Sequence, residues 1–481
     1  MTQNVQLVRL TTSERPGPPY RRCAFTVFAF ALAMGALIHE WNSTWTPWVA
    51  IPATVAAIAV LLRPASPVRV VVLLGTLVVE CIRQMPDPVN HQVLLGVLGA
   101  SLGVWWLGVL LRSPDVARDP AQLYDRIAPF LRVAFILMWI LAALAKVNAG
   151  FMDTASTCAV WILESIPLVD IPPVLVPAVI GGTLAMELSL PILLAFHRTR
   201  PLAIMVALPF HALSSLAGHS WFSGLAWAFY ALFLPPAVLA RGVLVARMLL
   251  PDRVRDAVDG ARARQWLTLG VLTVAFIVGH YVVVPALGPY AGGARHWGAV
   301  ILCLGWMAFT VVVLWRLRRS WFPGAPRPRA SLSVRNPVLI IGLVALVLNG
   351  ATPYLGLKTT AAFTMFSNLR TEPGHWNPLL VPESARVFGW LEGGDVRFTS
   401  TDDPEMQHLI DEEKSEHIVL MGARRIAQEH PDATVTYTLD GVPRTASPVA
   451  SDPVLGRPLS LAEEWFGAAR PYASAHETCQ H

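Results

Sequence analysis

The sequence predicts a mainly α protein, a polytopic transmembrane helical bundle of about 9–11 spans with a small extracytoplasmic α+β C-terminal domain. Three observations predict this fold class. Hydrophobic residues make up 54% of the 481 residues and charged residues only 14%, whereas soluble domains carry about 25% charged residues. Apolar runs recur up to Ala351. Beyond that residue charges become frequent, and no apolar run is long enough to span a bilayer.

The first element is a polar stretch, residues 1–22, which is predicted to be a cytoplasmic N-terminal tail. The apolar run that follows lacks a small-residue cleavage site, so we expect a retained helix rather than a removed signal peptide. Apolar runs of about 17–25 residues span a bilayer as helices. The candidate spans, several of them short, are Cys23–Ile38, Trp48–Leu62, Val68–Cys81, Val93–Leu111, Ile127–Ala149, Pro172–Phe196, Leu202–Ala217, Trp221–Leu239, Trp266–Leu287, Trp297–Leu314 and Val338–Ala351.

Positive charge alternates between the loops that connect these spans. Arginines cluster in every second loop, and the loops between are nearly free of basic residues, with Arg83 and Arg295 as exceptions. Cytoplasmic loops are enriched in Lys and Arg. The pattern therefore predicts a multi-pass protein of the cell inner (plasma) membrane, with residues 23–240 as a core, 241–351 as additional helices and 352–481 outside the cell.

Charge and cysteine patterns argue against several function classes. The net charge is +5, but the arginines lie between apolar runs, and neither a basic stripe with aromatics nor a Gly-rich phosphate loop occurs. We therefore expect no nucleic-acid partner. The five cysteines form no C-x-x-C pair. The predicted topology puts Cys81, Cys158 and Cys479 on the outer side, where an oxidising compartment permits a disulfide between two of them. Cys303 is predicted to be a small core residue.

The polar C-terminal part contains four local signals of secondary structure. Arg386–Trp390 and Val396–Thr401 flank a Gly-Gly turn, which predicts a hairpin. Residues Glu413–Glu429 are predicted to form one amphipathic helix. Asp440-Gly441 is a strong hairpin signal between Thr434–Leu439 and Val442–Thr445. Ser460 and Glu463 form a capping box that opens a last helix through Ala469.

Lys146, in the sequence ILAALAKVNAGF, is the most informative residue of the apolar part. A lysine near a helix end can extend its ammonium to the interface, which is a structural interpretation. Asn148 beside it suggests a polar cavity instead. Glu187 lies mid-span and needs Lys146, a histidine or Arg132 as partner, either to tie helices together or to carry a proton.

The stretch PFHALSSLAGHSWFSG adds His211, Ser215 and His219 at i, i+4 and i+8, which predicts one helical stripe. Such histidines can equally be hydrogen-bonded core residues, as can His280 in another span. No metal site is predicted, because metal helices use i, i+4 pairs with a carboxylate. Lys, Glu and His from three spans would thus reach the outer half of one bundle, where a desolvated lysine can act as a base.

Two segments carry a family resemblance. LAALAKVNAGFM resembles a segment of the vitamin K-dependent gamma-carboxylases and of bacterial proteins with a horizontally transferred transmembrane (HTTM) domain. The block from Met186 to Leu234 resembles the next signature of that family, and the resemblance covers about residues 20–240. TPYLGLKTTAAFTMFSNLRTE looks like a bacterial segment that would place Met365–Leu369 at the junction with the outer domain.

The resemblance implies that Lys146 is the base that deprotonates vitamin K hydroquinone or a menaquinol-like reduced quinone. Oxygenation then yields a stronger base, which removes a proton from a glutamate side chain, and the carbanion adds CO2. His211 would hold the quinone oxygen or the carbanion, and Glu187 would tune the pair. The chain departs from the pattern at Phe151, where the family has Trp, and at Ala149-Gly150, where an acidic residue is missing.

The expected function is that of a membrane enzyme, a quinol-dependent oxidase or carboxylase-like lyase, with O2 and CO2 as co-substrates if it carboxylates. Catalytic residues would be Lys146, His211 and Glu187. Residues predicted to bind substrate are Asn148, Ser215, His219 and Trp221. Expected partners are membrane lipid, the quinone and a peptide or protein substrate at the outer face. The alternative is a non-catalytic scaffold that presents the outer domain to a partner.

Overall fold

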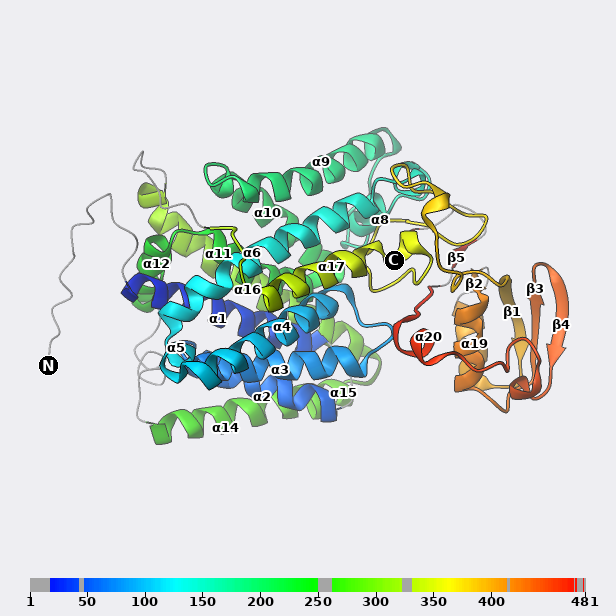
Figure 1. Ribbon diagram of the computed structural model, residues 1–481, viewed down its shortest axis with the longest axis horizontal. Helices are drawn as coiled ribbons and strands as arrows, with labels where there is room; N and C mark the ends of the chain where they lie inside the picture. Colours follow the sequence, from blue (N-terminus) through cyan, green and yellow to red (C-terminus); the bar gives the residue numbers. More distant parts are fainter. Residues whose placement is uncertain are drawn as a thin grey trace, which may run out of the picture.

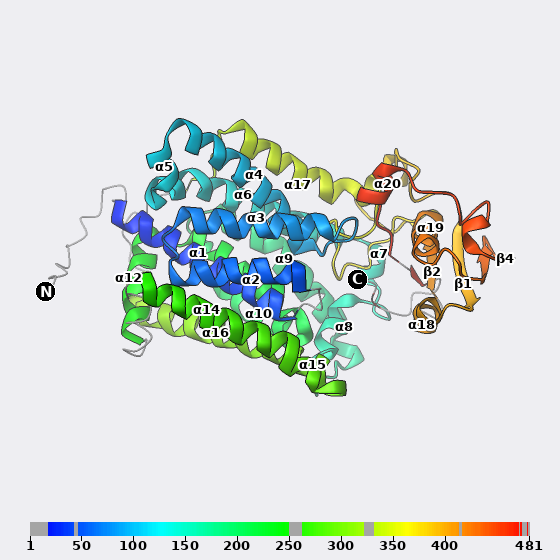
Figure 2. The same ribbon diagram turned by 90° about the horizontal axis from the view of Figure 1, so that it is seen from below.

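The structure, a computed structural model, describes residues 18–42, 47–249, 262–321, 331–412, 416–470, 472–473 and 479. A bundle of helices runs along the long axis, and a small domain with a sheet lies at one end (Figures 1 and 2). The first turn of α1 lies at the opposite end of the bundle (Figure 1). The predicted tail, residues 1–22, is shorter than expected, because Pro18–Arg22 belongs to α1, and residues 1–17 lie outside the described residues.

The helices of the bundle follow one another with short connections. They are α1 (Pro18–Asn42), α2 (Pro47–Leu62), α3 (Pro67–Arg83), α4 (Asn90–Arg112), α5 (Pro114–Arg118), α6 (Pro120–Ala145), α7 (Ala149–Met152), α8 (Cys158–Glu164), α9 (Val176–Ala195), α10 (Arg200–Ser214), α11 (Ser220–Phe233), α12 (Pro236–Leu249), α14 (Arg262–Val278), α15 (Val284–Ala286), α16 (Ala291–Trp321) and α17 (Pro337–Leu355).

Eight helical segments of the described chain are long and apolar enough to cross a membrane. They are Pro19–Trp41, Asn90–Arg112, Pro120–Ala145, Pro173–Ala195, Arg200–Phe233, Arg264–Ala286, Gly288–Arg316 and Pro337–Leu355. The number is below the predicted range for two reasons. The predicted spans in α2 and α3 lie in helices of 16 and 17 residues. The predicted spans Leu202–Ala217 and Trp221–Leu239 fall in one kinked unit followed by the short α12.

Apolar side chains cover the outside of the bundle as well as its inside. Trp266, Val271 and Val274 of α14 are each at least 60% exposed, and Ile341 of α17 is 67% exposed. Soluble monomers rarely expose contiguous apolar surfaces of this kind. The surface is therefore compatible with a multi-pass membrane protein.

Helix α1 lies at the centre of the bundle and packs against α2, α6, α11, α12 and α16. Its contact with α11 is close because glycines face each other there. A Cβ on Gly35 would lie 2.7 Å from the Cα of Leu225, and a Cβ on Gly224 would lie 2.8 Å from Cδ1 of Ile38. Small residues allow this approach of two backbones in a membrane bundle.

The C-terminal domain contains an antiparallel five-stranded sheet in the order β4-β3-β1-β2-β5. Its elements are β1 (Asp395–Thr401), α18 (Pro404–Glu412), β2 (Glu416–Val419), α19 (Leu420–Glu429), β3 (Val435–Leu439), β4 (Val442–Ala446), α20 (Leu461–Phe466) and β5 (Tyr472–Ala473). A separate apolar core forms between the sheet and α19, with Val396, Val435 and Tyr437 fully buried.

Two local predictions in this domain are confirmed. Strands β3 and β4 pair across Asp440-Gly441, and both turn residues have positive φ values of 50° and 77°, as a two-residue hairpin turn needs. The capping box is also present, because Ser460 Oγ accepts from the Glu463 amide and Glu463 Oε2 accepts from the Ser460 amide. The helix it opens ends at Phe466 rather than at Ala469.

Two other predictions are wrong because distant partners decide the structure. Arg386–Trp390 is not a strand, since the amides of Val387 and Phe388 donate to the Leu355 carbonyl at the end of α17. Strand β1 pairs with β2 and β3 instead. The predicted helix Glu413–Glu429 is divided, with β2 before α19, and residues 413–415 lie outside the described residues.

Cys158 and Cys479 form a disulfide, which is one of the pairings left open by the sequence. It joins the start of α8 to a residue near the C-terminus, 321 positions away. Cys81 and Cys303 are buried, and Cys303 belongs to the apolar core of the bundle, as predicted. The bond ties the C-terminal segment to the same end of the bundle as the small domain.

We predict that Cys479→Ser lowers the free energy of unfolding by about 2–5 kcal/mol, because a cross-link over a long loop restricts the unfolded chain. Thermal unfolding of purified protein with and without a reductant measures this effect. The reductant should lower the midpoint of the wild type and leave that of Cys479→Ser unchanged. Equal sensitivity of both proteins would contradict the prediction.

Candidate functional site

Lys146 forms a buried ion pair with Glu187. Lys146 follows the last residue of α6, and its Nζ lies 3.0 Å from Oε2 of Glu187 in the middle of α9. Nζ also donates a hydrogen bond of 3.2 Å to the Met365 carbonyl. The two side chains are only 4% and 6% exposed. The ammonium therefore does not extend to the surface, and of the three partners considered for Glu187 the structure supplies Lys146.

Met365 belongs to the segment that connects α17 to the C-terminal domain. This junction segment, residues 356–377, is rich in buried polar side chains, including Ser367, Asn368, Arg370 and Glu372. It contacts the end of α6, because the Met365 carbonyl accepts from Lys146 and the Ser367 carbonyl accepts from Asn148. The Lys146–Glu187 pair is thus held between α6 and α9 and contacted by one carbonyl of the junction segment.

The junction segment contains the second lysine that the structure describes. Lys358 donates hydrogen bonds to Asn349 Oδ1 at 2.8 Å and to the Ala361 carbonyl at 3.3 Å. Burial lowers the pKa of this ammonium to about 8. Lys358 is therefore an amine that can lose its proton near neutral pH, and it is a natural comparison for Lys146.

Asn148 connects α6 and α7 to the junction segment. Its Nδ2 donates to the carbonyls of Ala145 and Ser367 at 2.7 and 2.6 Å, and its Oδ1 accepts from the Phe151 amide at 2.8 Å. These contacts engage the donor and the acceptor of the side-chain amide. Asn148 was predicted to bind substrate, and the structure gives it contacts that hold the chain in place.

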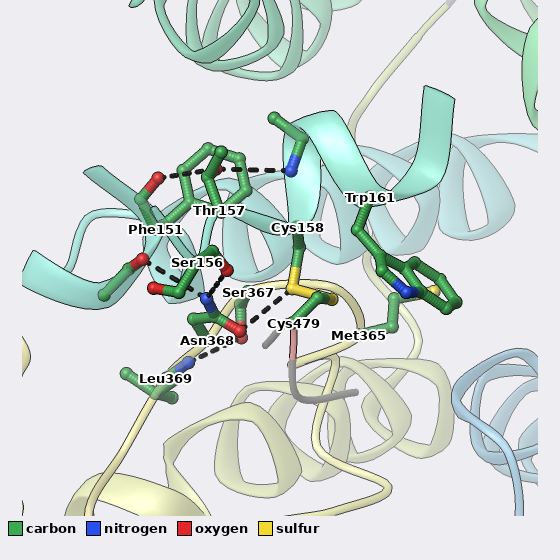
Figure 3. Close-up of a disulfide and its surroundings, with 12 residues drawn as sticks. Phe151, Ser156, Thr157, Cys158, Trp161, Met365, Ser367, Asn368, Leu369 and Cys479 are labelled. Carbon is green, nitrogen blue, oxygen red and sulfur yellow. Dashed lines mark hydrogen bonds between the residues drawn. A yellow bond between two sulfur atoms is a disulfide. The ribbon is translucent and has the colours of Figure 1, made fainter. Parts of the chain in front are cut away.

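Gly150 lies where two segments of the chain approach closely. A Cβ at this position would lie 2.9 Å from Nδ2 of Asn377 and 3.0 Å from the Asn368 carbonyl. Asn368 in turn donates to the carbonyls of Gly150 and Ser156 (Figure 3). Its Oδ1 lies 3.0 Å from Sγ of Cys158, which belongs to the disulfide. A side chain at position 150 would therefore push these two segments apart.

His211 lies in a different cluster from the ion pair. It is fully buried in α10, with Nδ1 at 3.3 Å from Ser223 Oγ and Nε2 at 3.3 Å from the Tyr230 hydroxyl. Aromatic rings surround it, among them Trp139 of α6 at a centroid distance of 6.2 Å. Trp139 precedes Lys146 by seven residues, about 10 Å along a helix. Among the described residues, no hydrogen bond or ion pair joins His211 to Lys146 or Glu187.

The stripe predicted for His211, Ser215 and His219 is interrupted. Residues Ser215–His219 form a π-type turn in which Gly218 has a φ of 98°, and this turns the chain into α11. Ser215 Oγ donates to the His211 carbonyl at 2.8 Å. The His219 ring instead packs on Phe366 of the junction segment, with ring centroids 4.3 Å apart. A glycine with positive φ is the local cause.

Trp221 belongs to a cluster that the sequence analysis missed. Its ring lies 6.0 Å from the His39 ring and 5.6 Å from the His91 ring. The cluster also contains Glu40 and Glu80, and all four ionisable side chains are at most 5% exposed. Two sequence signals could have revealed this cluster. His39-Glu40 lies at the end of one apolar run and Glu80 at the end of another, and ionisable residues within apolar spans often belong to functional sites.

A large apolar cavity lies among α1, α11, α12 and α16. Its volume is about 740 Å³, and its walls include Phe30, Trp227, Tyr230 and Trp306. Arg22 and Arg63 line it near the end of the bundle that lies opposite the C-terminal domain. The Tyr230 hydroxyl that contacts His211 belongs to the same residue that lines this cavity. The volume suits a drug-sized or larger apolar ligand.

We predict that Lys146→Met and Glu187→Gln each lower the free energy of unfolding by about 3–5 kcal/mol, because each leaves an unpaired buried polar or charged group. The double variant Lys146→Met/Glu187→Gln should lose less than the sum of the two single variants. Denaturant or thermal unfolding in one detergent completes this double-mutant cycle. Additive losses would show that the two side chains do not interact.

No protein-family model matches the chain, and no curated protein or solved structure matches it.

Proposed function

We propose that the chain is an integral membrane enzyme in which Lys146 acts as a base on a lipid-soluble quinol or a related substrate. The observation that carries this proposal is the buried contact of 3.0 Å between Lys146 and Glu187. An ammonium is an acid, so a lysine acts as a base only after it has lost its proton. Glu187 is placed to receive that proton, since both side chains are withdrawn from water.

In this proposal the apolar surroundings of the pair permit this transfer. Separated charges are costly in a low-dielectric interior, and a neutral amine beside a neutral carboxylic acid avoids that cost. The Met365 carbonyl accepts from Lys146 at 3.2 Å and so holds the amine in place. In this proposal Lys146 takes the acidic proton of a substrate, and Glu187 holds or releases the proton that Lys146 carried before.

The substrate class is proposed from the apolar cavity. A volume of about 740 Å³ with mostly apolar walls fits an isoprenoid or acyl chain. Tyr230 lines the cavity and is held by His211, which gives a polar head group a hydroxyl to bind. A reduced quinone bound there supplies an acidic phenol and electrons for O2. The Tyr230 hydroxyl, held by His211, would guide the head group, which in this proposal passes beyond the cavity to reach Lys146.

We also propose that the end of the bundle with the C-terminal domain lies outside the cell, in the inner (plasma) membrane. The disulfide between Cys158 and Cys479 supports this orientation, since such bonds persist in oxidising compartments. The alternation of arginine-rich loops supports it independently. Lys146 and Glu187 would then face the outer half of the membrane, where a peptide or protein substrate is accessible.

We predict that Lys146→Met abolishes quinol-dependent O2 uptake by protein in lipid nanodiscs, with a loss of about 100-fold or more, as expected when a general base is removed. Lys358→Met is the matched control, because it removes the other buried amine from the same end. It should retain activity. Full activity in a folded Lys146→Met would remove the enzyme proposal and favour the non-catalytic scaffold.

We predict further that organic extraction of the purified protein releases an isoprenoid quinone that mass spectrometry identifies. Trp227→Ala, which changes the cavity wall, should reduce the amount, whereas a substitution on the exposed face of α14, such as Val274→Ala, should not. Labelled CO2 with hydroquinone and Glu-rich peptides separates the two reactions. Incorporation of label indicates a carboxylase-like lyase, and O2 uptake without label indicates an oxidase.

A further inference from the structure

Four ionisable side chains meet at the end of the bundle near α1, α3 and α4, apart from the Lys146 site. His39 and Glu40 end α1, Glu80 lies in the last turn of α3, and His91 lies in the first turn of α4. One ligand atom each from His39, Glu40 and Glu80 lies within 4.8 Å of the others. A cation bound to all three would draw these atoms closer together, because metal–ligand bonds of about 2.0–2.2 Å are typical for nitrogen and carboxylate donors.

We propose that His39, Glu40 and Glu80 bind a divalent first-row transition cation. One imidazole and two carboxylates form a donor set that suits Zn²⁺, Mn²⁺ or Fe²⁺. The His39 ring presents Nε2 to Glu80 at 3.5 Å, so this nitrogen already faces the carboxylate with which it would share the cation. The proposal does not rest on the function proposed for Lys146.

His91 has the geometry of a residue that orients a metal ligand. Its Nε2 lies 3.0 Å from Nδ1 of His39, which is the ring nitrogen facing away from Glu80. A metal-bound histidine usually uses its second nitrogen in a hydrogen bond that fixes the tautomer and the orientation of the ring. His91 is therefore assigned as a positioning residue, held against Trp221 by a ring contact of 5.6 Å.

Burial makes the two carboxylates hard to explain without a positive charge. Glu40 and Glu80 are 0% and 1% exposed. Among the described residues, the ion-pair partner of Glu80 is His39, which is itself 5% exposed. Two carboxylates side by side in an apolar interior repel each other, and either protons or a metal ion must neutralise them. A divalent cation neutralises both at once and is contacted by both.

Gln92 supplies a second, independent observation in favour of a bound cation. Its Oε1 accepts from the Val89 amide at 2.9 Å, which fixes the amide orientation. Its Nε2 has no hydrogen-bond acceptor among the described residues, although the residue is only 3% exposed. Gln92 lines a small cavity of about 10 Å³ together with His39, Glu80, His91 and Trp221. That space is close to what one water molecule needs, so Gln92 can donate to a water on the cation.

Metal retention tests the proposal directly. Full-length protein in detergent is purified without chelators, incubated in turn with Zn²⁺, Mn²⁺ or anaerobic Fe²⁺, desalted and analysed by elemental mass spectrometry. We expect one cation per chain with at least one of these metals. Glu80→Gln keeps the size of the side chain and should weaken retention at least tenfold, whereas Glu372→Gln, which changes a buried glutamate of the junction segment, should retain the metal fully.

A spectroscopic measurement distinguishes a change at the metal site from misfolding of a variant. Wild-type protein loaded with Co²⁺ should show visible d–d absorption that is shifted by His91→Asn, because His91 orients the imidazole ligand. Retention of less than a tenth of an equivalent of every cation by the wild type would overturn the proposal and leave a carboxylate pair that shares a proton. Equal retention by wild type and Glu80→Gln would overturn it as well. Lys146→Met should lose the proposed enzyme activity and still retain the metal, so the metal site and the enzyme activity are tested separately.

Discussion

The enclosed contact between the Lys146 ammonium and the Glu187 carboxylate is the constraint on which the arrangement of this end of the bundle depends. Neither charge is tolerable alone at that depth, so α6 and α9 must pack with these two positions facing each other. The Met365 carbonyl fills a further donor position of the ammonium. The chain therefore has to bring its junction segment back over the end of α6 after the last span.

The remaining contacts of the junction segment follow from the same requirement. An irregular backbone at the edge of an apolar bundle must satisfy its donors and acceptors within the protein. Asn148 and Asn368 do this from opposite sides, each with donors to two carbonyls. The disulfide fixes the C-terminal segment beside them. An enzyme that uses Lys146 benefits from this rigidity, because a base must be held within hydrogen-bond distance of the proton it removes.

Sequence reasoning could predict what short-range physics decides. The pairing of Glu187 was foreseen because a mid-span carboxylate needs a cation, and the Asp440-Gly441 turn and the Ser460 capping box depend on a few adjacent residues. Sequence reasoning failed where contacts with distant segments determine the local structure. The stripe of His211 ends at the positive φ of Gly218, and Arg386–Trp390 binds the end of α17 instead of β1. The cluster of His39, Glu80 and His91 was not found because three separate helices, α1, α3 and α4, contribute to it.

The two polar clusters are linked through aromatic rings at the same end of the bundle. Trp221 contacts His39 and His91, and two positions earlier in the chain His219 packs on Phe366, the neighbour of Met365. The large apolar cavity has both Arg22 and Tyr230 among its lining residues. In the proposed function an apolar substrate in that cavity would approach the polar end from inside the bundle. Because charges interact more strongly where water is excluded, such a route would suit the buried lysine base that we propose.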